Sequence, residues 1–398
     1  MRTSLYCALV ALFVPHVLGA AAEPALRTEV ATIVQGPTER YYFAQARGGA
    51  VPDGGDAGVR IVLTMQEIEK KGGHGFHDVY HVESRDLGRT WSAPAKIESL
   101  TRRKIGDGTP DERVIGDLCP RYHSKSGKLL GTGKTFTFRG GTTEDRSREQ
   151  VSYAVFDPQS NAWSELRTVA MPSADHEGLP LLNPNAGCND RVDLPNGEIL
   201  LPIRYSKRAA PRDYTTIVAR CRFDGETLTY IEHGTELSRA GKRGLYEPSL
   251  AAVGGKFYLT LRSDDSAFVA TSDDGLHYAP YKEWTFDDGQ VLGSYNTQQH
   301  WAVHKDRLYL IYTRRGANND HIMRHRAPLY IAEVDQDKLC VKRATEQILV
   351  PENHADLGNF DVVPVSERET WVVVAESLVN GKRHDERNNV YAAKIFWE

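Results

Sequence analysis

The chain has 398 residues, of which 40% are hydrophobic and 26% are charged, with 34 glycines and 19 prolines. Its formal net charge of -4 excludes a uniformly basic surface of the kind that binds nucleic acid, so no nucleic-acid partner is expected. Length alone would allow two or three domains, but all-β propellers and barrels of this size often form one domain.

The N-terminal residues have the pattern of a secretory signal peptide. Arg2 precedes an apolar run from Leu5 to Leu18, and small residues follow at Gly19 to Ala22. This run is too short for a membrane span, and no other apolar stretch approaches the ~20 residues that a span needs. We therefore expect a signal peptide over residues 1–22, a single catalytic domain over residues 23–398, and a secreted or periplasmic protein without a membrane span.

Four cysteines follow the expected signal peptide: Cys119, Cys188, Cys221 and Cys340. None of them forms the closely spaced pairs that are typical of a zinc site. An oxidising compartment would permit disulfides, but each cysteine lies in an apolar strand pattern, where a small buried thiol behaves as a hydrophobe. The pattern favours buried free thiols.

Short apolar or alternating segments recur along the chain and are separated by turn residues, which favours an all-β fold. Two hairpins share one signature, because Ser84–Trp91 (SRDLGRTW) is a complete Asp-box and Thr271–Tyr278 (TSDDGLHY) keeps its Ser, Asp, Gly and aromatic positions. Degenerate versions occur at 156–163, 223–230 and 334–341. The aspartate of such a turn caps backbone amides while the aromatic residue packs between sheets, so we assign these residues no catalytic role.

Sheet-sized units that repeat about every 50 to 65 residues predict a β-propeller. We count six blades, with seven possible. Their apolar second strands are expected at 59–66, 128–136, 198–205, 256–263, 307–315 and 369–377. The segment Thr28–Gln35 has no partner in its own unit, so we expect it to complete the last sheet beside Asn389–Ile395 and to close the ring.

The antiparallel order of a blade brings inner-strand starts and second-strand ends to one face of the propeller. Polar side chains occupy the expected inner-strand starts: Arg121, His123, Asn189, Asp190, Arg191, Tyr246, Glu247, Gln299, His300 and Asn359. The second-strand ends add Gln66, Lys134, Arg204, Arg262, Arg314 and Arg315. A single such residue would most simply form a structural ion pair or cap a backbone amide. Because the whole set lies on one face, we interpret it as a binding site. Because arginine pairs bidentately with carboxylates, a carboxylate-bearing glycan fits this face.

The segment 294–330 places a crowded polar loop between two apolar strands. The loop contains Arg314, Arg315, Asn318, Asn319, Asp320, His321, Arg324, His325 and Arg326. A charged run is often simply solvated, but binding and catalytic residues concentrate on loops that a rigid scaffold positions. We therefore expect Arg314, Arg324, His325 and Arg326 to contact the substrate.

Two reactions fit an acidic glycan. Hydrolysis needs two carboxylic acids beside the glycosidic bond, for which Glu247, Asp190 and Asp320 are candidates. Elimination at a uronate needs a cation at the carboxylate, a base for the adjacent proton and an acid at the leaving oxygen. Histidine suits base and acid work near neutral pH.

For elimination we assign His300 and His321 to base and acid, with Tyr246 as a reserve acid. Arginines would hold or neutralise the carboxylate, and further polar residues would bind the sugars. The arginines are Arg191, Arg204 and Arg262, and the sugar-binding residues are His123, Asn189, Glu247, Gln299 and Asn359. A calcium ion could assist the neutralisation, although no motif indicates one.

The Asp-boxes resemble those of the sialidase superfamily, although no Phe-Arg-Ile-Pro motif occurs near the start of the chain. The chain is more similar to the propeller enzymes that act on terminal L-rhamnose-α-1,4-D-glucuronate of arabinogalactan-type glycans. This resemblance rests on the following segments: YEPSL (246–250), TSDDGLHY (271–278), EWTFDDG (283–289), GSYNTQQHW (293–301), YTRRGANNDHIMRHRAPLY (312–330) and LGNFDV (357–362). It is close in the C-terminal blades and loose in the N-terminal ones.

The resemblance implies a seven-bladed propeller and either a rhamnose-glucuronate lyase or an exo-α-L-rhamnosidase. The rhamnosidases use a single histidine on the opposite face, in an N-terminal blade, and Gln45–Gly55 contains none. We therefore predict a lyase that removes terminal rhamnose from glucuronate by β-elimination. An exo-α-L-rhamnosidase or a sialidase-like hydrolase is one alternative, and a non-catalytic propeller that binds acidic glycans is another.

Overall fold

The structure is a computed structural model that describes residues 26–36, 40–53, 57–70, 75–209, 213–377 and 388–398. The expected signal peptide lies outside these residues. Within them, no helix combines the length and the apolar character needed to cross a membrane.

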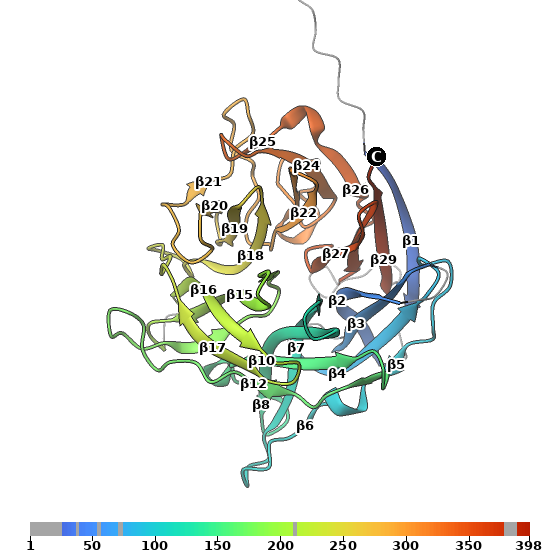
Figure 1. Cartoon of the computed structure of the whole chain (residues 1–398), viewed down its shortest axis with the longest axis vertical. Coiled ribbons are helices and arrows are strands. Elements are labelled where there is room, and N and C mark those ends of the chain that lie inside the picture. The colour runs from blue at the N-terminus through green and yellow to red at the C-terminus, as the bar shows by residue number, and fades with distance from the viewer. Residues whose placement is uncertain (1–25, 37–39, 54–56, 71–74, 210–212, 378–387) are drawn as a thin grey trace, which may run out of the picture.

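The described strands pair into six antiparallel sheets that are arranged around a common axis (Figure 1). The first contains β2 (Tyr41–Pro52), β3 (Val59–Glu69), β4 (Phe76–Ser84) and β5 (Ala95–Lys96). The second contains β6 (Arg103–Lys104), β7 (Glu112–His123), β8 (Lys128–Arg139), β9 (Thr143–Glu144), β10 (Val151–Asp157), β11 (Ala162–Trp163) and β12 (Arg167–Thr168). The third contains β13 (Leu182–Asn185), β14 (Val192–Asp193), β15 (Glu198–Ser206), β16 (Tyr214–Phe223) and β17 (Leu228–His233).

The fourth sheet contains β18 (Tyr246–Val253), β19 (Lys256–Arg262), β20 (Ala267–Ser272) and β21 (Lys282–Glu283). The fifth contains β22 (His300–His304), β23 (Arg307–Tyr312), β24 (Leu329–Asp335), β25 (Cys340–Val341) and β26 (Gln347–Val350). The sixth contains β27 (Phe360–Ser366), β28 (Glu369–Ala375), β29 (Asn388–Phe396) and β1 (Arg27–Gly36). Short 3₁₀ turns lie at Glu98–Leu100, Arg146–Arg148, Met323–His325 and Arg343–Thr345.

The all-β propeller predicted from the sequence is confirmed, and each of the six expected second strands lies in a different sheet. Second strands such as β28, which is buried along its whole length, pack against the neighbouring sheets on both sides. The side chains of Ile331, Phe360 and Val372 belong to one such core between the fifth and sixth sheets. Burial of these apolar surfaces between sheets is the main force that holds the ring together.

The predicted ring closure is also confirmed. Strand β1 pairs with β29 from Arg27 opposite Phe396 to Gly36 opposite Asn388, so both ends of the described chain meet in the sixth sheet (Figure 1). The Asn388 amide then donates to the carbonyl of Phe43 at 2.8 Å and ties this sheet to the first.

The Asp-boxes have the structural role expected of them. Asp86 accepts a hydrogen bond from the Thr90 amide at 2.9 Å, and Ser84 accepts one from the Gly88 amide at 2.8 Å. The ring of Trp91 lies 6.0 Å from that of Trp371, and this contact connects the first and sixth sheets.

The four cysteines of the described chain are buried and free, which confirms the prediction from their strand context.

Candidate functional site

The inner strands β2, β7 and β18 each contain a β-bulge close to the same face of the propeller. In each bulge a polar residue other than glycine has a left-handed backbone: Gln45 (φ 54°), Asp117 (φ 51°) and Glu247 (φ 44°). A bulge redirects a side chain out of the regular alternation, and left-handed backbone at such residues is a strain that concentrates at functional sites. The Asp117 amide donates to Gln45 Oε1 at 2.9 Å, so neighbouring bulges are in direct contact.

Cations surround these bulge residues. Lys134 lies 3.3 Å from the Asp117 carboxylate, and the Arg262 guanidinium is paired with Glu247. Burial raises the pKa of Glu247, but the charges of Arg262, Lys134 and Arg326 outweigh this effect and hold that pKa at about 2. Glu247 is therefore a carboxylate that neutralises part of a larger cationic cluster.

Tyr246 is the centre of a second group of contacts at the start of β18. Its hydroxyl donates to Asp264 Oδ1 at 2.6 Å and accepts from Arg243 at 2.6 Å. The guanidinium groups of Arg243 and Arg262 each lie 4.7 Å from the centre of the Tyr246 ring. Burial raises the pKa of Tyr246 to about 12, so the phenol stays protonated at neutral pH and can donate a proton.

Arg324 is an exposed residue whose positive charge lies close enough to this group to interact with it. Its pKa is lowered by partial burial and then by the nearby charges of Arg326, Arg262 and Arg243. Within the described part of the chain, its side chain makes no hydrogen bond and no ion pair. Its backbone and that of His325 are both left-handed, with φ of 56° and 53°.

Arg326, two positions after Arg324, is held firmly by its own contacts. Its guanidinium donates to Thr297 Oγ1 at 2.9 Å and to the Asn296 carbonyl at 2.8 Å, and it lies 3.4 Å from Asp356. Its donors are therefore held by the protein, whereas those of Arg324 are available to a ligand. We call Tyr246, Glu247, Arg262, Asp264 and Arg324, together with Arg243 and Arg326, the Tyr246 cluster.

Several residues expected from the sequence lie in or beside the Tyr246 cluster. Tyr246, Glu247, Arg262, Arg324 and Arg326 belong to it. Asn359 directly precedes β27, is half-buried and makes no side-chain hydrogen bond among the described residues. Arg204 is paired with Glu149 and stacks on the Tyr214 ring at 4.2 Å, so it supports the neighbouring third sheet.

His300 is the first residue of β22 in the fifth sheet and is fully buried. Its Nδ1 is 2.8 Å from Asp190 Oδ2 and 3.0 Å from Ser249 Oγ, while Nε2 has no hydrogen-bond partner among the described residues. The carboxylate and hydroxyl fix the ring and leave Nε2 as its unused nitrogen. This geometry suits a base, but the ring has no solvent exposure in this structure.

His321 is separated from His300 by its position in the loop after β23. Its side chain is 50% exposed, and its Nε2 lies 3.5 Å from Glu352. The structure therefore does not bring the two histidines expected to act together into contact.

The expected positions of His123 and Arg191 were wrong. Strand β7 runs from Glu112 to His123, so His123 and Arg121 end this inner strand instead of starting it. The bulge at Asp117 breaks the alternation that would have marked the true start. His123 binds Ser126 and the Gly197 carbonyl, each at 2.9 Å, in the turn after β7.

Arg191 lies between β13 and β14, after the inner strand of the third sheet has already begun. Its three nitrogens contact Asp193 at 2.8 Å and the carbonyls of Leu130 and Arg121 at 2.6 and 3.0 Å. These hydrogen bonds hold the second and third sheets together, so the guanidinium of Arg191 has a structural role.

The remaining candidates also make contacts within the protein. Asn189 donates to the Pro202 carbonyl at 2.8 Å, and Gln299 donates to Ser294 at 3.0 Å. Arg314 forms an ion pair with Glu346 at 2.6 Å, on the outer side of the fifth sheet. His325 contacts the Tyr295 hydroxyl at 2.6 Å and Asp320 at 3.0 Å, which orients the strained turn that carries Arg324.

Three residues of this region were not predicted from the sequence: Arg243, Asp264 and the bulge residue Asp117. Asp264 lies two positions after Arg262, just beyond the expected end of the second strand at residue 263. It would have been a candidate if the search for polar side chains at strand ends had included the residue that follows each strand. Arg243 and Asp117 carried no comparable signal, because one lies in an irregular loop and the other in a bulge.

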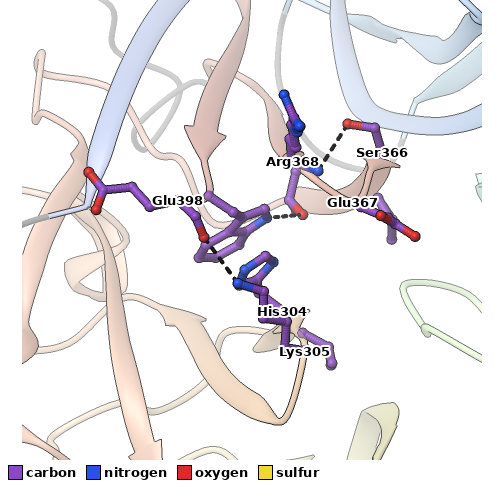
Figure 2. A pocket seen from close by; sticks show the side chains of 10 residues that line it. His304, Lys305, Ser366, Glu367, Arg368 and Glu398 are labelled. Carbon is purple, nitrogen blue, oxygen red and sulfur yellow. Dashed lines mark hydrogen bonds between the residues drawn. The ribbon is translucent and has the colours of Figure 1, made fainter.

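The opposite face of the propeller carries a cavity of about 720 Å³ between the fifth and sixth sheets. Figure 2 shows the turn at His304 and Lys305 and the turn from Ser366 to Arg368 around it, with Glu398 alongside. The His304 ring stacks on Trp397 at 4.9 Å, and Lys305 donates to the Glu398 carbonyl at 3.2 Å.

Comparisons with known proteins identify the fold of the chain but not the reaction that it catalyses. No family model and no curated protein sequence matches the chain. Among solved structures, a protein of unknown function from Dyadobacter fermentans is 16% identical, with a TM-score of 0.63, over 94% of this chain and 100% of its own. Trypanosoma rangeli sialidase is 14% identical, with a TM-score of 0.60, over 89% of this chain and 55% of its own.

A Hadza microbial sialidase is 13% identical, with a TM-score of 0.60, over 89% of this chain and 66% of its own. The chain thus spans little more than half the length of the trypanosomal enzyme and about two thirds of the microbial one. At these identities the similarity establishes only the architecture: the chain has a sialidase-like β-propeller fold.

Proposed function

We propose that this chain is a carbohydrate-active enzyme that binds the carboxylate of an acidic sugar at the Tyr246 cluster. We further propose that it removes terminal rhamnose from glucuronate by β-elimination. The observation that carries this proposal is Arg324, an unpaired guanidinium held on a strained turn among Arg243, Arg262 and Arg326.

The charges favour an anionic ligand over a neutral one. Three neighbouring arginines disfavour the cationic form of Arg324, and a carboxylate placed beside it would relieve this repulsion. Two consecutive left-handed residues cost on the order of 1–3 kcal/mol each, a strain that is common at ligand clamps. The planar fork of a guanidinium then matches the two oxygens of a uronate carboxylate.

The chemistry of elimination also fits the groups present. A carboxylate neutralised by arginine acidifies the neighbouring C5 proton, which a base removes. The electrons form the C4–C5 double bond, and the C4–O4 bond to rhamnose breaks. The O4 atom then takes the proton of the Tyr246 hydroxyl, whose raised pKa of about 12 makes it a proton donor and not a base.

His300 stays our candidate for the base, because Asp190 orients its ring and its Nε2 is unused among the described residues. Its burial requires the site to open when substrate binds. We assign His321 no step in the reaction, because its exposed side chain lies beside Glu352 and makes no contact with His300. A calcium ion that assists the arginines also stays a prediction, which chelation followed by calcium addition would test.

Hydrolysis is the second candidate, and one contact favours it. The 2.6 Å hydrogen bond from Tyr246 to Asp264 pairs a hydroxyl with a carboxylate that could activate it as a nucleophile. In that reaction water is consumed and no double bond forms.

The experiment that separates these reactions digests a rhamnose-capped arabinogalactan and follows ultraviolet absorbance of the unsaturated uronate together with released rhamnose. Both signals together support the lyase. Rhamnose without absorbance contradicts elimination and supports the hydrolase. Binding of the glycan without either product contradicts both reactions and leaves a binding propeller.

A further inference from the structure

A second group of ligating side chains lies on the third sheet, at the outer strand and away from the propeller axis. His233 is the last residue of β17, which is the outermost strand of that sheet, and Glu236 follows it closely (Figure 1). His176 comes from the turn that precedes β13. Two segments that are far apart in the sequence therefore bring two imidazoles and one carboxylate together.

The distances are close to those of a metal site. His233 Nε2 lies 3.3 Å and His176 Nδ1 lies 3.7 Å from Glu236 Oε1. All three ligand atoms lie within 4.8 Å of one another. The ligand atoms of a tetrahedral ion with bonds of about 2.1 Å are separated by roughly 3.4 Å. The two rings are stacked with centroids 4.1 Å apart, so a turn of the His176 ring is needed to direct its lone pair at the ion.

Two of the three ligands are already held in place. The His233 side chain is 2% exposed, and its Nδ1 lies 2.7 Å from the Tyr230 hydroxyl. A histidine that binds a metal through one nitrogen usually donates from the other to such a partner. Glu236 Oε1 accepts from the His176 backbone amide at 2.8 Å, which fixes the carboxylate beside both rings.

The turn that carries His176 is rigid as well. Asp175 accepts hydrogen bonds from the amides of Leu179 at 2.8 Å and Glu177 at 3.0 Å. The position of His176 is therefore set by a closed turn, while its side chain is 60% exposed and stacks on the His233 ring.

The surrounding charges favour a cation on the imidazole side. Asp175, Glu177 and Glu236 all lie within 3.2 Å of the Lys207 ammonium. Three carboxylates against one ammonium leave a net charge of two negative units. Lys207 already occupies the space between the carboxylates, where calcium or magnesium would need oxygen ligands. The imidazole nitrogens suit a softer divalent ion such as zinc.

We propose that His176, His233 and Glu236 bind one divalent transition ion of the zinc type, with its remaining coordination positions open to solvent. The ion would link the turn before β13 to the end of β17. Because β13 leads into the inner part of the third sheet, the bound ion would stabilise this blade without touching the Tyr246 cluster.

Calorimetric titration of the chelator-treated, full chain with Zn²⁺ tests this proposal, with Ca²⁺ as the comparison and the melting temperature as a second readout. We expect one Zn²⁺ per chain and a higher melting temperature with Zn²⁺, whereas His176→Ala should leave any response to Ca²⁺ unchanged. His176→Ala should weaken Zn²⁺ binding by at least about tenfold. Since this side chain is exposed, the variant should fold normally without the ion.

His277→Ala is the matched control, because His277 is also exposed and lies 2.7 Å from Asp274. It should bind Zn²⁺ as the parent does. The proposal is overturned if the parent binds no Zn²⁺ or if His176→Ala binds it equally well. It is also overturned if binding is lost in His321→Ala instead, since His321, Glu352 and His354 form another possible ligand set.

Discussion

The two faces of this propeller carry similar residue types but differ in how the backbone holds them. On the opposite face, Lys305 is left-handed (φ 54°) because it lies in the tight turn between β22 and β23, where such a conformation is normal. On the candidate face, Glu247 is left-handed within a strand, and Arg324 is left-handed beside an equally strained His325. This difference is the reason why we place the proposed site at the Tyr246 cluster, where strain is combined with an unpaired charge, and not at the cavity of about 720 Å³.

The largest expected effect comes from removing the proton donor of the Tyr246 cluster. Tyr246→Phe should lower the rate of product formation by about 10²–10⁴-fold, as is typical for loss of a general acid. Tyr258→Phe is the matched control, because that buried hydroxyl bonds Gln336 at 3.1 Å far from the cluster. Parent-like turnover in Tyr246→Phe would remove this residue from the reaction.

The next prediction compares arginine substitutions on the two faces of the propeller. Arg324→Ala should raise KM by roughly 10–100-fold, because a charge-assisted hydrogen bond contributes about 1.5–3 kcal/mol. Its stability should stay unchanged, since the side chain has no partner in the described structure. Arg368→Ala, which changes the cavity of Figure 2, should leave KM unaltered. Equal effects of both substitutions in steady-state kinetics would contradict the assignment of the site.

A smaller effect is expected from a substitution in an Asp-box, which lies outside the proposed site and should change stability but not activity. Ser84→Ala removes the buried hydroxyl that bonds Asp86 at 2.9 Å and the Gly88 amide at 2.8 Å in the first Asp-box. The free energy of unfolding should fall by about 1 kcal/mol, the usual net contribution of such a hydrogen bond. Denaturant titration measures this loss, and kcat and KM should match those of the parent. A large loss of activity would show that the Asp-box does more than hold the turn.

The last prediction concerns the pH dependence of stability. The pKa of Glu247 is about 2 in the folded chain, against 4.5 for an unperturbed glutamate. Because the folded value is the lower one, the contribution of this carboxylate to stability is complete above pH 4.5 and is lost as the pH falls towards 2. The difference in unfolding free energy between the parent and Glu247→Gln should be constant near neutral pH and shrink in that acidic window. A difference that changes near neutral pH would contradict the low pKa.

The repeating parts of the fold could be predicted from the sequence because each obeys a regular pattern. The strand alternation, the Asp-box turns and the unpaired segment Thr28–Gln35 together identified the propeller and its closure. The position of Tyr246 and Arg262 followed from the same regularity, since they are directly opposite one another in the pairing of β18 with β19.

The rest of the candidate site could not be predicted, because β-bulges interrupt the alternation of side chains along the strands. A bulge adds one residue to a strand and moves the following side chains to the other face. For this reason Asp117 was missed, and His123 was placed at the wrong end of β7. The contacts of Arg191 and the burial of His300 depend on how neighbouring blades pack, which no single strand pattern encodes.

The central claim, that the Tyr246 cluster recognises a carboxylate and uses it in the reaction, is tested most directly by changing the substrate. The rhamnose-capped glycan would be compared with the same glycan after reduction of its glucuronate carboxyl groups to alcohols. We predict rhamnose release together with the unsaturated uronate from the acidic glycan, and no release from the reduced one. Equal release of rhamnose from both glycans would contradict the account.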